Sequence, residues 1–193
     1  MGQDSERFWD ERYRTEEAVP ERGPAAFLVE HRRLLPPQGR ALDVAMGTGR
    51  NALYLASLGY EVTGIDVSGV AVARCREEAS GCGLRIEAVQ ANLESYELPR
   101  AAYDIVIDFY YLQRDLAPQL EAALRPGGVM VFESFTTEQR RFGWGPQQDA
   151  FLLRPGELRS LFPGLETLEY REGMVESERG MKAVAGLVGK KRL

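Results

Sequence analysis

The stretch that decides the fold is Leu-Asp-Val-Ala-Met-Gly-Thr-Gly-Arg-Asn at residues 42–51. An apolar run leads directly into two glycines, which predicts a buried strand at Arg40–Ala45, a tight turn, and a helix at Asn51–Leu58. Gly47 and Gly49 let the backbone turn sharply and approach a ligand with no side chain in the way. The free N–H groups at the helix start favour a carboxylate or a phosphate. The turn is therefore a candidate ligand site.

Outward from this turn, apolar runs alternate with helical patterns. Strands are predicted at residues 60–65, 84–89, 103–107 and 129–132, with a helix at 68–80 that Ser68 is placed to cap. A second helix is predicted from leucines at every fourth position, Leu112, Leu116, Leu120 and Leu124, and Pro126-Gly127-Gly128 is expected to end it. Such alternation predicts an α/β fold, a doubly wound Rossmann-like sheet with helices on both faces.

The pattern changes after residue 135. A loop is predicted at 136–152 and a short helix at 155–161, followed by strands at 165–171 and 182–188 around a polar turn. These last strands should pair antiparallel. The complete sheet is then expected to have seven strands, mostly parallel, with one antiparallel strand near the C-terminal end.

The composition is that of an ordinary globular protein. The 193 residues are 44% hydrophobic and 27% charged, which suits one domain with a substantial core. The net charge of −5 argues against a nucleic-acid partner. We expect neither a membrane span nor a signal peptide, because the sequence has no run of about 18 apolar residues and no apolar N-terminal region. Cys75 and Cys82 lack the spacing of a metal site and are expected to be reduced thiols in a cytoplasmic protein.

Two aspartates indicate which ligand the turn binds. The pattern Gly47-x-Gly49-x-x-Ala52 also fits the dinucleotide fingerprint, which is weak without context. Asp43, just before the turn, would attract an ammonium group and repel a pyrophosphate. Asp66, after the second strand, could accept the two hydroxyls of a ribose, although capping of the next helix competes as its role. Together they favour a nucleoside that carries an amino acid over NAD.

Several segments resemble the class I S-adenosylmethionine (SAM)-dependent methyltransferases, and they occur in the same order along the chain. They span residues 40–135 and are 42–51, Gly64–Ser68, Ala91–Leu93, Tyr103–Val106 and Leu124–Gly128. Outside them, residues 8–13 and 153–158 are similar to the branch that contains the tellurite-resistance methyltransferases. The resemblance implies one methyltransferase domain over 1–193. Within it we expect an N-terminal helical lid segment at 1–37, a SAM-binding core at 38–135, and an acceptor loop, short helix and hairpin at 136–193.

The resemblance implies SAM as the cofactor and S-adenosylhomocysteine as its product. The turn would hold the methionine part with Asp43 facing the amino group, and Asp66 would bind the ribose. Asn92 by its side chain and Leu93 by its backbone N–H would meet the adenine. Asp108 would lie near the sulfonium. The implied cofactor-binding residues are Asp43, Ala45, Gly47, Thr48, Gly49, Asn51, Asp66, Val67, Asn92, Leu93 and Asp108.

Two positions depart from the family pattern. Ala45 replaces the usual first glycine of the turn, and we expect it to keep the negative φ of most alanines and leave the turn intact. Asn92 replaces the usual aspartate, and as a neutral acceptor it should bind the adenine amino group more weakly than a carboxylate.

We expect in-line transfer of the methyl group to a small-molecule acceptor in a monomer or homodimer, with no nucleic acid, membrane or metal involved. Alignment and exclusion of water would supply catalysis. An oxygen acceptor would need a base, for which Asp108 and Tyr110 are candidates and Glu133 a weaker one. The expected lid and acceptor residues are Trp9, Tyr13, Tyr111, Arg114, Arg140 and Trp144.

Structural roles for several of these residues, and other functions for the chain, are alternatives to these expectations. Core packing explains Tyr110 and Tyr111 about as well as acceptor contact does, and the arginines could be simple surface charges. A SAM-binding regulatory or partner subunit without catalysis is the alternative function, supported by Ala45 and Asn92. An NAD-dependent oxidoreductase is less favoured, because it conflicts with Asp43 and the sequence lacks a Tyr-x-x-x-Lys pair.

Overall fold

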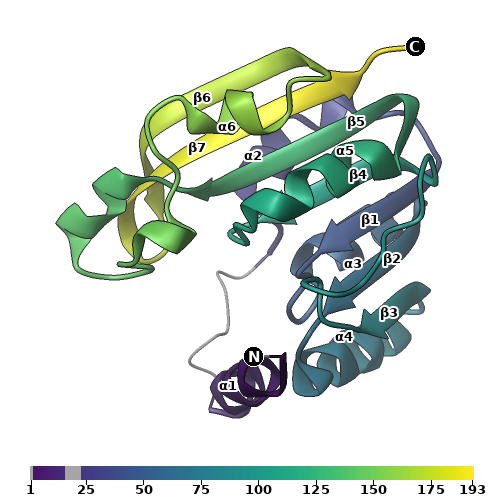
Figure 1. Cartoon of the computed structure of the whole chain (residues 1–193). Helices are drawn as coiled ribbons and strands as arrows, with labels where there is room; N and C mark the ends of the chain where they lie inside the picture. The colour runs from purple at the N-terminus through teal and green to yellow at the C-terminus, as the bar shows by residue number, and fades with distance from the viewer. Residues whose placement is uncertain (1, 16–22) are drawn as a thin grey trace.

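The computed structural model describes residues 2–15 and 23–193 (Figure 1). Its helices and strands are α1 (Gly2–Arg14), α2 (Ala26–Glu30), β1 (Arg40–Val44), α3 (Arg50–Ser57), β2 (Glu61–Asp66), α4 (Gly69–Gly81), β3 (Ile86–Gln90), β4 (Tyr103–Phe109), α5 (Ala117–Ala123), β5 (Leu124–Phe135), α6 (Glu157–Leu161), β6 (Leu165–Ser177) and β7 (Gly180–Lys191). Short 3-10 turns lie at Arg32–Leu34, Arg114–Leu116, Thr137–Phe142 and Asp149–Phe151. The lid segment expected at 1–37 includes residues 1 and 16–22, which lie outside the described residues.

The strands form one seven-stranded sheet in the order β3-β2-β1-β4-β5-β7-β6. Neighbours from β3 to β5 pair in parallel, while β7 is antiparallel to both β5 and β6. The sequence prediction of a mostly parallel sheet with one antiparallel strand is therefore confirmed. From β1 the chain adds β2 and β3 on one side and then β4 and β5 on the other. The strand order reverses between β1 and β4, and ligands of open α/β sheets bind at such a point.

Helices cover both faces of the sheet. On one face, α2 and α3 bury Phe27, Leu28 and Leu55 against apolar side chains of β1, β4 and β5. On the other, the region of α5 and α6 contributes Leu120 and Leu158 to the larger core cluster. Figure 1 shows α5 in front of the sheet and α2 and α3 behind it, with α1 beside α4. The parallel pairing of β1 with β2 and with β4 brings the carboxyl ends of these three strands together at one edge.

The leucine stripe at 112–124 is not one helix, and this part of the prediction is wrong. Leu116 ends a 3-10 turn, α5 covers only Ala117–Ala123, and Leu124 already begins β5 by pairing with Tyr103. All four leucines are nonetheless buried in one cluster. Pro118 lies in the first turn of α5, the position a proline tolerates best, so the helix begins there and not at Leu112. The segment Pro126-Gly127-Gly128 consequently lies inside β5.

None of the described helices is long and apolar enough to cross a membrane. Among the described residues, no group of three or more His, Cys, Asp or Glu side chains is placed to hold a metal ion. Both cysteines are free thiols.

Candidate functional site

The turn after β1 has three residues with positive φ. They are Gly47 at 57°, Gly49 at 85° and Ala45 at 50°. The expectation that Ala45 keeps a negative φ is wrong. The next residue, Met46, donates its N–H to the carbonyl of Ile65 at 3.0 Å, and this bond to β2 fixes the direction of the turn. A side chain in this region costs about 1–2 kcal/mol relative to glycine.

Asp43 presents an unpartnered carboxylate oxygen at the turn. The side chain is 1% exposed, and its Oδ2 has no hydrogen-bond partner. Burial raises the pKa of Asp43 to about 8, against the lowering effects of the Ala52 backbone N–H and the Arg50 charge. A buried carboxylate lacking a partner is costly, and a cation at this place would remove the cost. The orphaned oxygen thus fits the ammonium group of SAM.

Asp66 fixes the shape of the turn at the end of β2. Its Oδ2 accepts the Gly47 N–H and its Oδ1 accepts the Ser68 N–H, both at 2.8 Å. Burial raises the pKa of this carboxyl group, and the two backbone bonds oppose the rise. The capping role and the ribose role expected for Asp66 are compatible, because a carboxylate has about four acceptor positions and two are used here. Ser68 caps α4 as predicted, accepting from the Ala71 N–H at 3.1 Å.

Helix α1 lies over this turn. A Cβ atom placed on Gly47 would lie 2.6 Å from the hydroxyl oxygen of Tyr13, so that hydroxyl lies against the backbone of the turn. Burial and then the charges of Asp66 and Asp43 raise the pKa of Tyr13. Trp9, one turn earlier on the helix, is 37% exposed and lies 6.1 Å from the Tyr13 ring. Of the two residues expected to form a lid, Tyr13 lies against the turn, and Trp9 packs beside Tyr13 on the same helix.

The pattern of the sequence did not reveal the contact that holds α1 in place. Asp10 accepts from the Ser68 hydroxyl at 2.6 Å and from the Val70 N–H at 3.2 Å, both at the start of α4. Asp10 lies one helical turn before Tyr13 on the same face of the helix, and this spacing could have indicated that Asp10 also faces the protein.

Other residues that the family resemblance implies to bind the cofactor are hydrogen-bonded or packed within the protein. The Asn92 side chain accepts from the Glu94 N–H at 3.0 Å, and that of Asn51 accepts from the Ala25 N–H at 2.8 Å. Leu93 is buried in the larger core cluster. Val67 accepts from the Gln90 side chain through its carbonyl at 3.4 Å, and Thr48 is partly buried in the turn. Their roles toward SAM stay predictions.

Asp108 and the tyrosines that follow it line the other side of the switch point. Asp108 is 1% exposed and pairs with Val44 across β1 and β4. Burial raises its pKa well above the usual range, and the nearby Asp43 charge adds to this. It accepts the Tyr111 N–H at 3.3 Å. Burial also raises the pKa of Tyr111, whose hydroxyl donates to Gln113 at 2.6 Å.

Arg114 and Arg140, two of the expected lid and acceptor residues, donate hydrogen bonds to backbone carbonyls of the 136–152 segment. Arg114 makes a paired contact with Glu157 at 2.6 and 2.9 Å and donates to the carbonyls of Ala150 and Leu152. Arg140 bonds to Asp149 and to the Gln147 carbonyl within the loop itself. Both arginines therefore have partners within the protein, and their role toward an acceptor stays a prediction.

Aromatic side chains form a wall where β4 and β5 end: Tyr110 directly after β4, Phe135 at the end of β5, and Trp144 beyond it. The Trp144 ring meets Phe135 edge-on with centroids 5.9 Å apart, and Phe135 lies 5.0 Å from Tyr110. Through Phe135, the 136–152 segment therefore brings the predicted acceptor residue Trp144 toward Tyr110, a predicted catalytic base.

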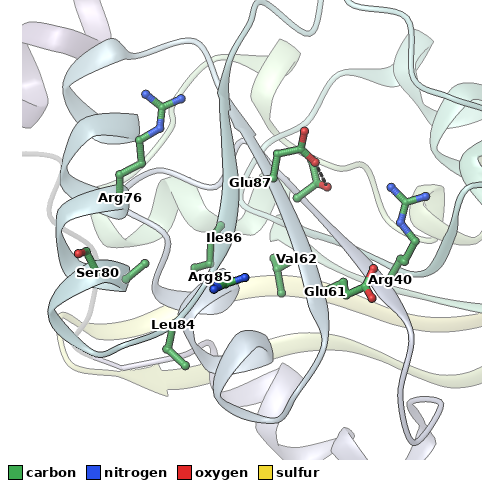
Figure 2. A pocket seen from close by; sticks show the side chains of 11 residues that line it. Arg40, Glu61, Val62, Arg76, Ser80, Leu84, Arg85, Ile86 and Glu87 are labelled. Carbon is green, nitrogen blue, oxygen red and sulfur yellow. Dashed lines mark hydrogen bonds between the residues drawn. The ribbon is translucent and has the colours of Figure 1, made fainter.

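A hollow of about 550 Å³ lies elsewhere, at the amino ends of β1, β2 and β3 (Figure 2). The side chains around it include Arg40, Glu61, Thr63, Arg76, Arg85 and Glu87. Charges of both signs line it, and Thr63 donates to Glu87 at 3.0 Å. The strands run from this hollow toward the glycine turn, so it lies at the opposite end of the sheet from the candidate site.

Comparisons with known proteins find related sequences and a related fold. A family model described as a methyltransferase domain matches residues 41–128. The probable S-adenosyl-L-methionine-dependent methyltransferase TehB of Haemophilus influenzae is 26% identical over 157 residues, 77% of this chain and 53% of that protein. A malonyl-(acyl-carrier protein) O-methyltransferase of Enterobacter lignolyticus is 30% identical over 139 residues, 65% of this chain and 53% of that protein. The crystal structure of the Haemophilus TehB has a TM-score of 0.73 at 22% identity, covering 95% of this chain and 67% of that chain. The chain spans about half the length of the curated relatives named here.

Proposed function

Because this chain belongs to the class I SAM-dependent methyltransferases, we propose that it transfers the methyl group of SAM to a small-molecule acceptor. Binding would place the sulfonium methyl group in line with the acceptor at the edge formed by β1 and β4. Most of the rate would come from this alignment and from the exclusion of water.

The observation that carries the proposal is the orphaned oxygen of Asp43. It is buried beside the glycine turn, where the methionine part of SAM is expected, and its charge would be paired by the ammonium group. A dinucleotide would bring a pyrophosphate toward the same carboxylate, which is unfavourable for two negative charges. Asp43 therefore supports SAM over NAD.

Asp66 provides a direct test of the cofactor site. Loss of a charge-assisted hydrogen bond to a ribose hydroxyl should weaken SAM binding in Asp66→Asn by about tenfold or more in calorimetric titration. Asp104→Asn is the matched control, since Asp104 also accepts a backbone N–H, from Arg40 at 2.8 Å, but at the amino end of β4. Thermal unfolding of both variants would check that they fold. Equal SAM affinity in wild type and Asp66→Asn would refute the ribose assignment.

The acceptor is proposed from this chain's own residues, because only one of the two relatives' names states an acceptor. One relative acts on malonyl-(acyl-carrier protein), and the name of the other states no acceptor. Here partly buried aromatic side chains lie near the end of β4. Tyr110 and Tyr111 come shortly after Asp108 in the chain, and Trp144 packs on Phe135, which contacts Tyr110. Such a wall suits a small organic acceptor better than a macromolecular surface. Formation of S-adenosylhomocysteine against a panel of phenols, thiols and oxyanions tests this proposal.

A SAM-binding protein without catalysis is the second candidate. Two observations support it. Ala45 has a positive φ in the turn, which is strained for a residue with a side chain, and the Asn92 side chain already accepts a hydrogen bond from the Glu94 N–H. Tight SAM binding with no product formation from any acceptor in the panel would favour it.

A further inference from the structure

The side chain of Gln139 is fully buried under the 136–152 segment and uses both ends of its amide group. Its exposed fraction is 0%, its Oε1 accepts from the Ala183 N–H of β7 at 2.9 Å, and its Nε2 donates to the Trp144 carbonyl at 3.0 Å. Glutamine is seldom fully buried, because an unpaired buried amide is costly. One buried side chain therefore ties the backbone at Trp144 to the sheet.

The backbone around Trp144 is shaped for this attachment. Trp144 lies between Gly143 at φ 67° and Gly145 at φ 77°, so the chain on either side of it adopts the left-handed conformation that favours glycine. The residues that follow, 147–150, are exposed, so the segment lies on the surface. Surface loops are usually mobile and tolerate change, whereas this one is fixed from below by Gln139. The place of Trp144 is thus specified by the fold.

The Trp144 ring is held at the outer end of the aromatic wall. It meets Phe135 edge-on with centroids 5.9 Å apart, and Phe135 lies 5.0 Å from Tyr110. All three rings are partly buried, so each also keeps exposed surface. Tyr110 follows Asp108 by two residues, and Asp108 pairs with Val44 at the end of β1. The wall therefore begins at the strand ends of the candidate site and leads from there to Trp144.

At Tyr110 the ring, and not the hydroxyl group, is the surface that the wall offers. The hydroxyl donates to Glu133 Oε1 and accepts from Lys182 Nζ, each at 2.6 Å. The backbone φ is +68°, a conformation that in bulky residues clusters at functional sites. Two cations lie near the ring, Lys182 Nζ at 4.9 Å and the Arg50 guanidinium at 5.9 Å from its centroid. A cationic ligand on the wall would be repelled by these charges, whereas a neutral or anionic one would not.

We propose that Trp144 contacts the methyl acceptor, that Gln139 is the residue that positions it, and that the acceptor is a neutral or anionic aromatic compound. This inference rests on the proposed methyltransferase function and names the class of small molecule that the site would take. Pairs of aromatic rings gain stability from stacked and edge-on contact beyond the area that they bury. A wall of three rings consequently favours a planar ring over a saturated one of the same size. The cations beside Tyr110 disfavour an ammonium compound.

The first test measures the position of Trp144 in the free protein. The chain has two tryptophans, so Trp9→Phe leaves Trp144 as the one source of tryptophan fluorescence. In this background, Gln139→Met should increase the population of displaced Trp144 about fivefold, the effect of one lost hydrogen bond. The emission should move to longer wavelength, and quenching by acrylamide should increase, because the ring becomes more exposed.

A second variant and a control accompany this measurement. Gln139→Asn keeps an amide at the buried position but is one methylene too short to reach both partners, so it should shift the emission in the same direction. Gln148→Met, at an exposed glutamine of the same segment, should leave the emission unchanged. Thermal unfolding identifies the variants that fold. Emission and quenching that stay at the values of the Trp9→Phe parent in a folded Gln139 variant would overturn the role of Gln139.

The second test asks whether Trp144 contacts the acceptor. The probes are two matched pairs, thiophenol with cyclohexanethiol and p-cresol with 4-methylcyclohexanol, whose members differ in the aromatic ring alone. For an aromatic probe, Trp144→Ala should raise KM about three- to tenfold, the scale of one aromatic pair, while kcat stays within about twofold because the contact is made equally before and in the transition state. Gln139→Met should shift KM in the same direction, and Trp144→Phe should keep most of the wild-type affinity. KM for the saturated partner and the dissociation constant of SAM should stay within about twofold.

The outcomes of this second test separate the inference from the proposed function. An unchanged KM for the aromatic probes in Trp144→Ala, an equal rise for both members of a pair, or wild-type turnover of aliphatic thiols or oxyanions but of no aromatic compound would overturn the inference. In each of these cases the methyltransferase activity itself would stand. Failure of wild type to bind SAM, or binding without turnover of any compound, would instead refute the proposed function.

Discussion

At the scale of single residues, the buried carboxyl group of Asp43 should make the stability of the protein depend on pH. Its pKa is about 8 in the folded protein and near 3.9 in an unfolded chain. Folding therefore takes up a proton between these values. The stability that the raised pKa contributes is fully present below about pH 4 and is lost as the pH rises through about 8. The apo protein should be less stable at pH 8 than at pH 5 for this reason.

The variant Asp43→Asn should remove that dependence. From pH 5 to pH 8, the unfolding free energy of the variant should gain on that of wild type by on the order of a few kcal/mol, measured by urea denaturation. Asp115→Asn, at an exposed position, should run parallel to wild type. If the unfolding free energies of Asp43→Asn and wild type changed equally with pH, Asp43 would already be ionised in the apo protein.

The affinity for SAM should depend on pH in the opposite direction to the stability of the apo protein. An ammonium partner needs the Asp43 carboxylate, so binding releases the proton that the apo protein holds. The affinity for SAM should rise about tenfold for each pH unit up to about pH 8, and calorimetry in buffers of different ionisation enthalpy should record one proton released. In Asp43→Asn the affinity should be weaker and independent of pH over this range.

The residues of the site differ in how far the sequence could predict them. Asp43 lies near the end of β1 and Asp66 ends β2, and the carboxyl ends of adjacent parallel strands must meet at one edge, so their placement could be predicted. The positive φ of Ala45 and Tyr110 could not. Each is set by a hydrogen bond across the sheet, Met46 to Ile65 in one case and Tyr110 to Glu133 in the other. Lys182 gave a signal that went unused, as a lone cation at the start of a long apolar run.

At the scale of elements, the turn after β1 is fitted against α4. A Cβ on Gly49 would lie 2.3 Å from the sulfur of Cys75, a fully buried thiol of that helix. Burial raises the pKa of Cys75 to about 11, which makes it a packing group and not a nucleophile. The order of elements and the faces they cover were predictable from periodicity. This one-atom fit between segments 26 residues apart was not.

We expect Gly49→Ala to destabilise the protein by about 2–4 kcal/mol, from the positive φ and from overpacking together. Cys75→Ala alone should cost about 1 kcal/mol or less, since it removes one sulfur atom. In the double variant the steric part should be relieved and the backbone part should remain, so the two effects should not add. Chemical denaturation of the four proteins measures this. Strict additivity would mean that the turn and the sulfur are not in contact.

At the scale of the whole molecule, the candidate site is assembled from both ends of the described chain. The C-terminal β7 carries Lys182 to the β4–β5 edge, and the N-terminal α1 closes over the β1 turn. Between these ends, the Asp66 carboxylate accepts hydrogen bonds from the backbone N–H groups of Gly47, in the turn, and of Ser68. The Ser68 hydroxyl in turn donates to Asp10 of α1. A ligand that orders Asp66 is therefore connected through two hydrogen bonds to the helix that covers it.

This connection predicts that α1 controls the release of SAM. Asp10→Ala removes two hydrogen bonds that dock α1 on α4, a loss comparable to that of a helix cap, or about 1 kcal/mol. Amide hydrogen exchange in residues 2–14 should rise, and the affinity for SAM should fall about fivefold, mainly through faster dissociation. Glu11→Ala is the matched control, because Glu11 is exposed and its ion pair is with Arg14 of the same helix. Exchange and dissociation rates that change equally in the two variants would show that α1 is held by its apolar face, and that the bond from Asp10 to Ser68 does not link the lid to the cofactor.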